Sequence, residues 1–467
     1  MRIALVNTNR IQPPIAPIGL EYLAETLFHA GYKPDLLDLC WEEDWRNGMR
    51  RFFGSREYDV VGFTLRNTDD CAFTSRHSFL PEFLDILDCA RDMTKAFILV
   101  GGVGFSTMPD LILEACSADA GVHGSGEHTM LRLLQCLDLN EEWRRIPGLI
   151  FREGDRLHRN PMDPGGGPGL PPMKRRWLDN PRYFNMGGQA GIETKRGCPW
   201  KCIYCCEPFA KGSKVIARPA RDVAQELQSL IDQDIDHVHT CDSEFNLPLE
   251  HAEMICEEIV RRGLGSKLRW YAYCTPSPFT RELAGLMKRA GCTGINFGVD
   301  SGDGTMLRRL NRPYGPEDIL RAVRWCRDEG IVVMLDLLFG SPGESRESVT
   351  RTIELVKESG SERAGVSTGV RVWPGTVLAS RVKDSPLRSG LIGSNGPTEP
   401  LFFIEPSLGK EIFDLLDRLI GGDERFFFFN PSDAGQNYNY NGNEVLVDAI
   451  DRGYRGAYWD ILRRLPL

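Results

Sequence analysis

Residues 198–206 read Cys-Pro-Trp-Lys-Cys-Ile-Tyr-Cys-Cys, a dense group of cysteines in a chain that holds 14. Cys198, Cys202 and Cys205 have the spacing C-x3-C-x2-C, and three such thiolates can bind three irons of a [4Fe–4S] cluster while the fourth iron stays open. A zinc site usually needs a fourth Cys or His. Cys206 is a poor fourth ligand because its side chain must diverge from that of the adjacent Cys205. The stretch therefore predicts an open iron–sulfur site, with a chance group of buried cysteines as the alternative.

The composition indicates an ordinary globular chain. It has 467 residues, of which 42% are hydrophobic and 26% charged, and acidic side chains exceed basic ones by 65 to 56. The net charge of −9 disfavours a protein that binds nucleic acid along its phosphates. The longest apolar runs, at 97–105 and 332–339, are too short to cross a bilayer, and the first residues have no signal-peptide layout. We therefore expect a cytoplasmic protein with neither nucleic acid nor membrane as a partner.

A stretch rich in Gly and Pro divides the chain. Residues 163–172, DPGGGPGLPP, cannot continue a helix or a strand, so we place a linker at 163–185. On both sides of it, short apolar runs alternate with helical segments, which is typical of βα units and parallel sheets. We predict an α/β protein with a Rossmann-like domain at 1–162 and six further βα units at 186–400, which form an open or partial barrel.

The remaining residues, 401–467, are rich in aromatic side chains and Asn. We predict a small C-terminal cap that faces the substrate. An aromatic mini-core is the alternative role for most of the residues that would close the cavity, which are Tyr438, Tyr440, Tyr454, Tyr458 and Trp459.

The cysteine motif and the landmarks after it resemble the radical S-adenosylmethionine (SAM) superfamily over nearly the whole chain. In that family the open iron binds the amino and carboxylate groups of SAM, and an aromatic residue precedes the last cysteine, as Tyr204 does here. CDSEFN (241–246), GINFGVDSG (294–302), LLFGSPGES (337–345) and GVRVWPGT (369–376) follow in the family's order. The resemblance implies a partial (β/α)6 barrel. It also implies SAM contacts by Asp242 and Glu244 at the amino group, by Asp300 and Ser301 at the ribose, and by the last strand around Arg371. For each acidic residue, a solvated loop charge is the alternative.

The N-terminal part resembles the cobalamin-binding domain that precedes many radical SAM barrels. Its glycines follow apolar strands, and backbone can approach a bulky corrin only where side chains are absent. Ligands of open parallel sheets also bind at the carboxyl ends of the strands, where these loops lie. The residues that the resemblance places on cobalamin are Arg66, Asn67, Gly101, Gly102, Gly104, Ser106, Gly124, Gly126 and Glu127.

The first-strand loop departs from many cobalamin domains, which carry there a histidine that binds the cobalt from below. Here the loop reads NTNRIQPPIAPIG, and His77 and His123 are candidates by proximity alone. Arg66 follows a later strand, and a guanidinium has no lone pair for a metal. If Arg66 lies under the corrin, the cobalt has no protein ligand below and gives up its methyl group more readily. A salt bridge from Arg66 to Asp69 or Asp70 is the equally weighted alternative.

Together the two resemblances imply a class B radical SAM methyltransferase of the histidine-less kind, which includes the tryptophan 2-C-methyltransferase type. One SAM would methylate cobalamin, a second would be cleaved to a radical at the cluster, and the methyl group would pass to a substrate carbon. We expect a [4Fe–4S] cluster, SAM and cobalamin as cofactors. A small-molecule or peptide substrate and an external one-electron reductant of the flavodoxin or ferredoxin type complete the expectation.

Three other functions remain. The same cofactors serve rearrangement or cyclisation without methyl transfer, which product mass distinguishes. A methylthiotransferase acting on transfer RNA would need a second cluster, for which Cys40, Cys71 and Cys116 could be nominated, and a basic tail that this chain lacks. A cobalamin sensor with a vestigial barrel would predict an eroded cysteine motif, whereas the motif is intact.

Overall fold

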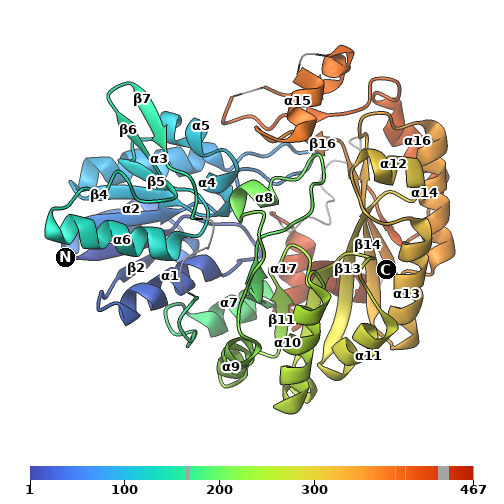
Figure 1. Cartoon of the computed structure of the whole chain (residues 1–467), viewed down its shortest axis with the longest axis horizontal. Helices are drawn as coiled ribbons and strands as arrows, with labels where there is room; N and C mark the ends of the chain where they lie inside the picture. The colour runs from blue at the N-terminus through green and yellow to red at the C-terminus, as the bar shows by residue number, and fades with distance from the viewer. Residues whose placement is uncertain (164–168, 384, 395, 430–440, 466–467) are drawn as a thin grey trace.

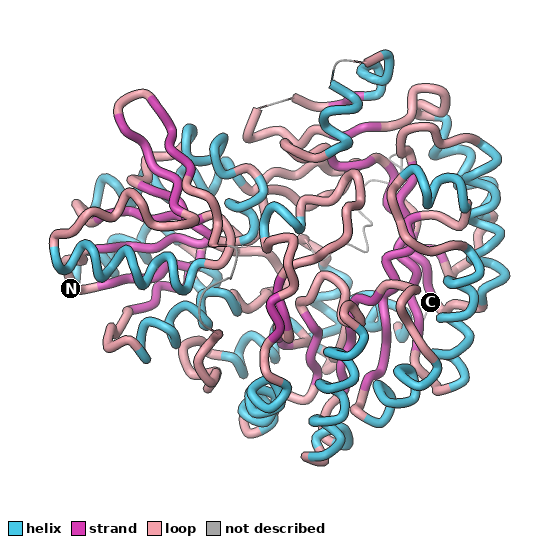
Figure 2. Tube along the Cα trace, in the orientation of Figure 1, coloured by secondary structure: helices cyan, strands magenta, loops and turns pink. Residues whose placement is uncertain are grey.

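Two large helix-covered sheets form the framework of the protein (Figure 1). The computed structural model describes residues 1–163, 169–383, 385–394, 396–429 and 441–465, and within them each large sheet has seven strands. Figure 2 shows the strands of each sheet grouped together, with helices around them. The prediction of an α/β protein with two successive parallel sheets is confirmed.

The N-terminal sheet is Rossmann-like, with an antiparallel hairpin at one edge. Its strand order is β2-β1-β3-β4-β5-β6-β7, and the first five strands are parallel. Every residue of β1 is buried because helices cover both faces, as is usual for a parallel sheet. The strands are β1 (Ile3–Asn7), β2 (Asp35–Asp38), β3 (Val60–Thr64), β4 (Phe97–Gly101), β5 (Ala120–Val122), β6 (Leu149–Glu153) and β7 (Arg156–Arg159).

Two groups of helices enclose this sheet. Apolar residues of α1 and α6 form one core with it, and those of α2, α3, α4 and α5 form another. The helices are α1 (Ile18–His29), α2 (Trp45–Ser55), α3 (Leu80–Met93), α4 (Val103–Thr107), α5 (Pro109–Ala115) and α6 (Gly126–Leu139), with a 3-10 turn η1 (Leu39–Trp41).

The second sheet is an open barrel with the order β19-β15-β14-β13-β12-β11-β8, all parallel. The six predicted strands are present, and a seventh, β19, comes from the C-terminal tail. β8 and β19 are the two edges, so the described part of the sheet does not close. The strands are β8 (Ala190–Ile192), β11 (His237–Thr240), β12 (Arg269–Cys274), β13 (Cys292–Asp300), β14 (Val332–Phe339), β15 (Arg363–Thr368) and β19 (Phe426–Phe427).

Helices cover the outer face of the barrel and share one large core with its strands. α14 shows why they begin and end where they do: Ser345 caps its start in a capping box, and Gly360, at φ +72°, ends it in the left-handed conformation. The covering helices are α9 (Ala220–Ile231), α10 (Leu249–Arg261), α11 (Arg281–Arg289), α13 (Pro316–Asp328), α14 (Arg346–Ser359) and α16 (Glu411–Ile420). Shorter elements are α8 (Glu207–Ala210), η2 (Leu264–Ser266), α12 (Gly304–Arg309) and the two-stranded β9 (Lys195–Arg196) with β10 (Ile216–Ala217).

The described parts of the C-terminal tail pack against the barrel and extend its sheet. α16 packs on its outside and β19 extends its sheet, while β18 (Phe402–Phe403) pairs with β16 (Val370–Arg371) and β17 (Leu391–Ile392). Trp459 and Ala457 pack against Tyr271 and Met334 inside the barrel. The remaining elements are α15 (Val377–Lys383), η3 (Pro386–Gly390), α17 (Glu444–Asp451) and α18 (Tyr458–Arg464). No helix among the described residues has the length and apolar character that crossing a bilayer requires.

Buried ion pairs join the two domains. In the linker, which also forms α7 (Asn180–Gly187), Arg175 is fully buried and pairs with Glu21 of α1 at 3.2 Å and with Glu226 of α9 at 3.1 Å. Arg196 binds both carboxylate oxygens of Glu127 at 2.8 Å and also pairs with Glu193. Such desolvated, hydrogen-bonded pairs fix geometry, so the facing edges of the two sheets are held in one arrangement.

Candidate active site

A cavity of about 920 Å³ lies between the two domains. The N-terminal domain lines it with the loops that follow β3, β4 and β5, and the barrel lines it with residues of all six predicted strands or the loops after them. Both sheets thus contribute their carboxyl-terminal edges, where parallel sheets bind ligands. The cavity is therefore the candidate site for cofactors and substrate.

The three predicted cluster ligands lie on one wall of this cavity. Cys198, Cys202 and Cys205 follow β9 and all line the cavity. Burial raises the pKa of the Cys198 thiol to about 11 and that of the Cys202 thiol above its ordinary value, so metal binding must displace protons there. Cys206 is different: it begins α8 and packs against the core of the N-terminal domain, away from the cavity lining.

The arrangement of the thiols argues against a single metal ion. In the part of the chain that the structure describes, no three metal-binding side chains converge on one point. A tetrahedral zinc ion needs such convergence, whereas a [4Fe–4S] cluster takes each thiolate on a different iron. Cys40 lies in η1, Cys71 in the loop after β3 and Cys116 directly after α5, so these three cysteines come from separate elements of the N-terminal domain.

Arg312, which the sequence analysis did not single out, lies beside the cysteines. Its Nη1 is 3.4 Å from the Sγ atom of Cys202, and its Nε donates to Asp300 at 2.5 Å. Asp300 also accepts a 2.7 Å hydrogen bond from the Tyr204 hydroxyl. The guanidinium places a fixed positive charge at the edge of the cysteine wall. No motif marks Arg312, because it follows α12 in an ordinary Asn-Arg-Pro loop.

Of the two carboxylates predicted at the SAM amino group, only Glu244 has a free acceptor. Its Oε2 atom is buried without a hydrogen-bond partner among the described residues, and Arg312 lies 3.6 Å from its other oxygen. Burial raises the pKa of Glu244 to about 7, although Arg312 opposes the shift. Asp242 also lines the cavity, but its oxygens are bound by Thr194 and Lys195, so it fastens β11 to the loop after β8.

The other predicted SAM contacts lie behind the cavity wall. Asp300 binds Arg312 and Tyr204, and Ser301 is buried against Thr352 of α14; neither lines the cavity. Arg371 pairs with Asp69 of the N-terminal domain at 2.9 Å and stacks over Trp373, so the structure gives it an interdomain role. The strand-end motifs showed where these residues lie in the sequence. A motif does not show in which direction a side chain points.

The opposite wall is lined largely by backbone. Gly101, Gly124 and Gly126 line the cavity, and a Cβ atom on Gly126 would meet nothing within 4 Å. Gly102 also lines the cavity, but its φ of +100° and the carbonyl of Leu65, which a Cβ would overlap, account for that glycine by themselves.

Three more residues that were predicted to contact cobalamin form contacts within the protein. A Cβ on Gly104 would come within 2.9 Å of the Asn67 backbone, so this glycine serves packing inside the domain. Ser106 accepts a hydrogen bond from the Gly124 amide at 3.0 Å and thereby shapes the loop after β5. Glu127 faces the cavity but is bound by Arg196; burial opposes its ionisation, yet Arg196 holds its pKa below the ordinary value.

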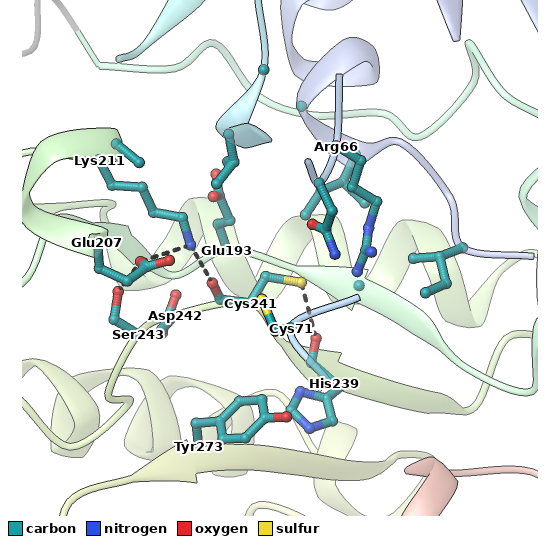
Figure 3. Close-up of a pocket in the computed structure, with 18 of the residues that line it drawn as sticks. Arg66, Cys71, Glu193, Glu207, Lys211, His239, Cys241, Asp242, Ser243 and Tyr273 are labelled. Atoms are coloured by element: carbon teal, nitrogen blue, oxygen red, sulfur yellow. Dashed lines mark hydrogen bonds and ion pairs between the residues drawn. The ribbon is translucent and has the colours of Figure 1, made fainter. Parts of the chain in front are cut away.

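Arg66 and Asn67 line the cavity from the end of β3, and Arg66 extends toward Cys241 and His239 of the barrel (Figure 3). Asp69, one alternative partner of Arg66, is bound by Arg371, and Asp70 accepts from Ser75. His77 lines a smaller pocket on the other side of Arg66, and His123 contacts the Phe209 carbonyl at 2.7 Å. Among the described cavity-lining residues His239 is the one histidine, and it belongs to the barrel.

The inward face of the barrel carries polar side chains that the sequence analysis missed. His239, Tyr273, Asn296 and Asp336 line the cavity from β11, β12, β13 and β14, and the rings of His239 and Tyr273 lie 5.1 Å apart. Lys211 forms an ion pair with Glu207 at 3.2 Å, and Ser243 donates to Glu207 (Figure 3). A polar residue within an apolar strand was the available signal for Asn296 and Asp336.

The predicted closing residues divide into two groups. Tyr458 and Trp459 line the cavity, whereas Tyr454 packs against a small apolar cluster of α17 and α18. Tyr438 and Tyr440 lie outside the described residues. The aromatic tail thus contributes both to the cavity and to a mini-core.

Comparison with known proteins settles the family. Residues 192–356 match the radical SAM superfamily and residues 4–134 match the B12 binding domain. The tryptophan 2-C-methyltransferase of Streptomyces laurentii is 33% identical over 98% of this chain and 95% of its own length. The chain belongs to the cobalamin-dependent radical SAM methyltransferases.

Solved structures of this methyltransferase family have the same fold. The radical SAM methyltransferase TsrM from Kitasatospora setae, with tryptophan substrate and a SAM analogue bound, superposes with a TM-score of 0.92. It is 30% identical, and the match covers 99% of this chain and 97% of that one. A second TsrM structure, with cobalamin and a [4Fe–4S] cluster bound, superposes with a TM-score of 0.90 at 29% identity. The predicted cofactors of this methyltransferase, the [4Fe–4S] cluster, SAM and cobalamin, are thereby confirmed.

The cavity of this methyltransferase suits those groups. The orphaned Oε2 of Glu244, beside the cysteine wall, matches an ammonium donor such as that of SAM. Open space at Gly126 matches a bulky ligand that approaches the backbone, and a leucine or phenylalanine there would fill it.

Proposed function

We propose that this methyltransferase transfers a methyl group to C2 of the indole ring of tryptophan or a close relative of tryptophan. The observation that carries the proposal is the near-complete match, at 33% identity, to a relative named for that reaction. The cavity supports it, because aromatic rings of His239, Tyr273 and Trp459 lie among its lining residues and can pack against an indole.

When bound, cobalamin would carry the methyl group, SAM would supply it, and the iron–sulfur cluster would supply electrons. We assign Cys198, Cys202 and Cys205 to the cluster and Glu244 to the SAM amino group. Arg312 holds a positive charge next to Cys202, which favours a negatively charged cluster and the carboxylate of a bound SAM. The buried pairs of Arg196 and Arg371 keep the two walls at a fixed separation, so that both cofactors meet one enclosed space.

We further propose that Arg66 takes the place of the histidine that other cobalamin domains offer the metal. It lies at the carboxyl end of β3 and lines the cavity, and the other cavity-lining residues described in the N-terminal domain include no histidine. A guanidinium cannot ligate cobalt and disfavours a higher positive charge nearby.

We place the enzyme in the cytoplasm, where a flavodoxin or ferredoxin can supply the electrons that cobalamin and the cluster require. Cys202 and Cys205 are partly exposed next to the surface residue Lys201, which gives a one-electron donor a short path to the cluster.

Anaerobic reconstitution with iron, sulfide, cobalamin and SAM, followed by mass spectrometry of tryptophan, tests the proposal. A product heavier by one CH2 group, with the new carbon on indole C2, is expected. A product of unchanged mass would instead support rearrangement. The Cys202→Ala variant is the control for methylation that does not depend on the cluster.

A further inference from the structure

Basic residues are concentrated around the loop that carries the cysteine motif. Three stretches come together there: 195–216 with the cysteines, 301–315 with α12, and 369–392 with α15. They hold twelve basic and three acidic residues, although acidic residues exceed basic ones by 65 to 56 in the whole chain. The protein is acidic, but the surroundings of the cysteines are basic.

Hydrogen bonds join the three stretches. The Ile203 amide donates to the Leu310 carbonyl at 3.2 Å, and the Leu378 amide of α15 donates to the Ile203 carbonyl at 2.8 Å. The Lys201 carbonyl accepts a 2.7 Å hydrogen bond from the Asn311 side chain. The cysteine loop is therefore held between α15 and the residues that follow α12 (Figure 1).

Three cations on these stretches are directed to solvent. Lys201, Arg308 of α12 and Arg381 of α15 are all exposed, and no acidic side chain in the described part of the chain forms an ion pair with them. Lys201 lies between Cys198 and Cys202 in the sequence, so one of these charges belongs to the cysteine motif itself. Unpaired surface charge of one sign attracts a partner of the opposite sign.

Two exposed apolar side chains accompany the cations. Val377 is 48% exposed and lies one helical turn before Arg381, and Phe209 of α8 is 41% exposed. A Cβ on Gly375 would lie 3.8 Å from the Phe209 ring, so Phe209 adjoins the start of α15. Apolar contact within a charged rim is typical of a protein interface, whereas phosphate-backbone binding depends mainly on charge. The cluster-loop surface comprises Lys201, Phe209, Arg308, Val377 and Arg381.

We propose that the cluster-loop surface is the docking site of an acidic one-electron carrier protein of the flavodoxin or ferredoxin class. The inference rests on the proposed function and names where its electron donor binds. At each encounter the carrier loses one electron and the cluster bound by the three cysteines gains it, with no bond made or broken. Electron-transfer complexes are small and short-lived, and complementary charge accelerates their formation.

Reversal of two of the cations tests the surface by binding alone. The dissociation constant of oxidised flavodoxin for the reconstituted holoenzyme should rise on the order of tenfold in the Lys201→Glu, Arg381→Glu double variant at low ionic strength. The difference should shrink in about 0.5 M salt, because salt screens exposed charges. Lys267→Glu is the matched control, since Lys267 is an exposed cation just before β12, at the opposite end of the barrel strands.

A second measurement separates docking from catalysis. Activation of the double variant by reduced flavodoxin should fall by a similar factor. Titanium(III) citrate, a small reductant that needs no docking surface, should restore methylation to the rate of the natural enzyme. Iron content and melting temperature should match those of the natural protein.

Each outcome decides the inference. If the double variant binds flavodoxin as tightly as Lys267→Glu does, the surface is wrong while the proposed function stands. The same holds if the natural enzyme binds neither flavodoxin nor ferredoxin, or binds RNA in their place, yet methylates tryptophan with titanium(III) citrate. If neither reductant supports methylation but flavodoxin binding depends on the two cations, the proposed function fails and the docking surface stands. Arg308→Glu gives an independent measurement if the double variant does not fold.

Discussion

The two walls of the cavity are constructed in opposite ways. On the N-terminal wall, Gly101, Gly124 and Gly126 present backbone, which suits a large ligand that fits by shape. On the barrel wall, thiols, carboxylates and the Arg312 guanidinium line the cavity, which suits smaller ligands that bind through charge and coordination. The difference predicts that changes on the first wall exclude a ligand by volume, whereas changes on the second remove a specific bond.

The largest expected effect is loss of a cluster ligand from the barrel wall. Cys202→Ala leaves two thiolates for a cluster that needs three, so iron–sulfur absorbance and all methylation should fall below detection. Cys206→Ala is the matched control, because Cys206 packs toward the N-terminal core. Retention of iron by Cys202→Ala together with its loss in Cys206→Ala would reverse the ligand assignment.

Substitutions at two glycines of the N-terminal wall distinguish loss of space for a ligand from loss of folding stability. Gly126→Leu projects into open space, so we expect corrinoid binding to weaken at least about tenfold with an unchanged melting temperature. Gly102→Ala should instead destabilise the domain by about 1–3 kcal/mol, since its φ of +100° and the Leu65 carbonyl both disfavour a side chain. Corrinoid titration and thermal unfolding of both variants measure the two effects. Equal loss of stability in both would contradict the assignment of Gly126 to the ligand.

The same contrast explains what could be predicted from the sequence. βα alternation, the Gly-Pro linker and the cysteine spacing are local patterns. The two sheets were predicted correctly, and the three cysteines of the motif line one cavity. The seventh strand β19 was missed because two residues of a tail carry no periodicity. Its pairing with β15 depends on long-range packing.

The same distinction between local patterns and long-range packing applies to the site residues. Glycine-rich loops marked the N-terminal wall because absence of a side chain is visible in a sequence. On the barrel wall, the strand-end motifs predicted Glu244, which lines the cavity, but also Ser301 and Arg371, whose side chains bind Thr352 and Asp69. The direction of a side chain and its partners across the domain interface depend on the tertiary structure and cannot be read from a local pattern. Arg312 was not found for the same reason.

Variants of Arg66 test whether the N-terminal wall leaves the cobalt without a protein ligand. Electron paramagnetic resonance of Co(II) cobalamin in the natural enzyme should show no nitrogen splitting. Arg66→Lys keeps the charge and most of the activity. Arg66→His offers a nitrogen ligand and should introduce splitting and slow methylation by about tenfold, equivalent to about 1.4 kcal/mol in the barrier. Nitrogen splitting in the natural enzyme would instead identify a histidine or the cofactor's own base as the axial ligand.

The smallest expected effect is a change of kcat/KM with pH, which follows from the charge of Asp336 on the barrel wall. The pKa of Asp336 is raised to about 7, so its carboxylate is mostly protonated below that pH and ionised above it. The amino group of free tryptophan stays protonated across this interval. At saturating SAM, kcat/KM for tryptophan should therefore rise about threefold from pH 6.5 to 7.5.

Other titrating groups of the cavity must be separated from Asp336 in this profile. Asn296 on β13, Tyr273 on β12 and His239 on β11 line the same cavity, and Asp300 acts on Asp336 from behind the wall. Burial lowers the pKa of His239, which keeps it neutral. Burial also raises the pKa of Glu244 to about 7, but we have proposed Glu244 as a contact of the SAM amino group, so saturating SAM is expected to remove its influence on substrate binding. The Asp336→Asn variant should flatten the rise, because it removes the titrating carboxylate. A rise that persists in this variant would assign the titration to another group of the cavity, since the charge of Asp336 would then not be coupled to catalysis.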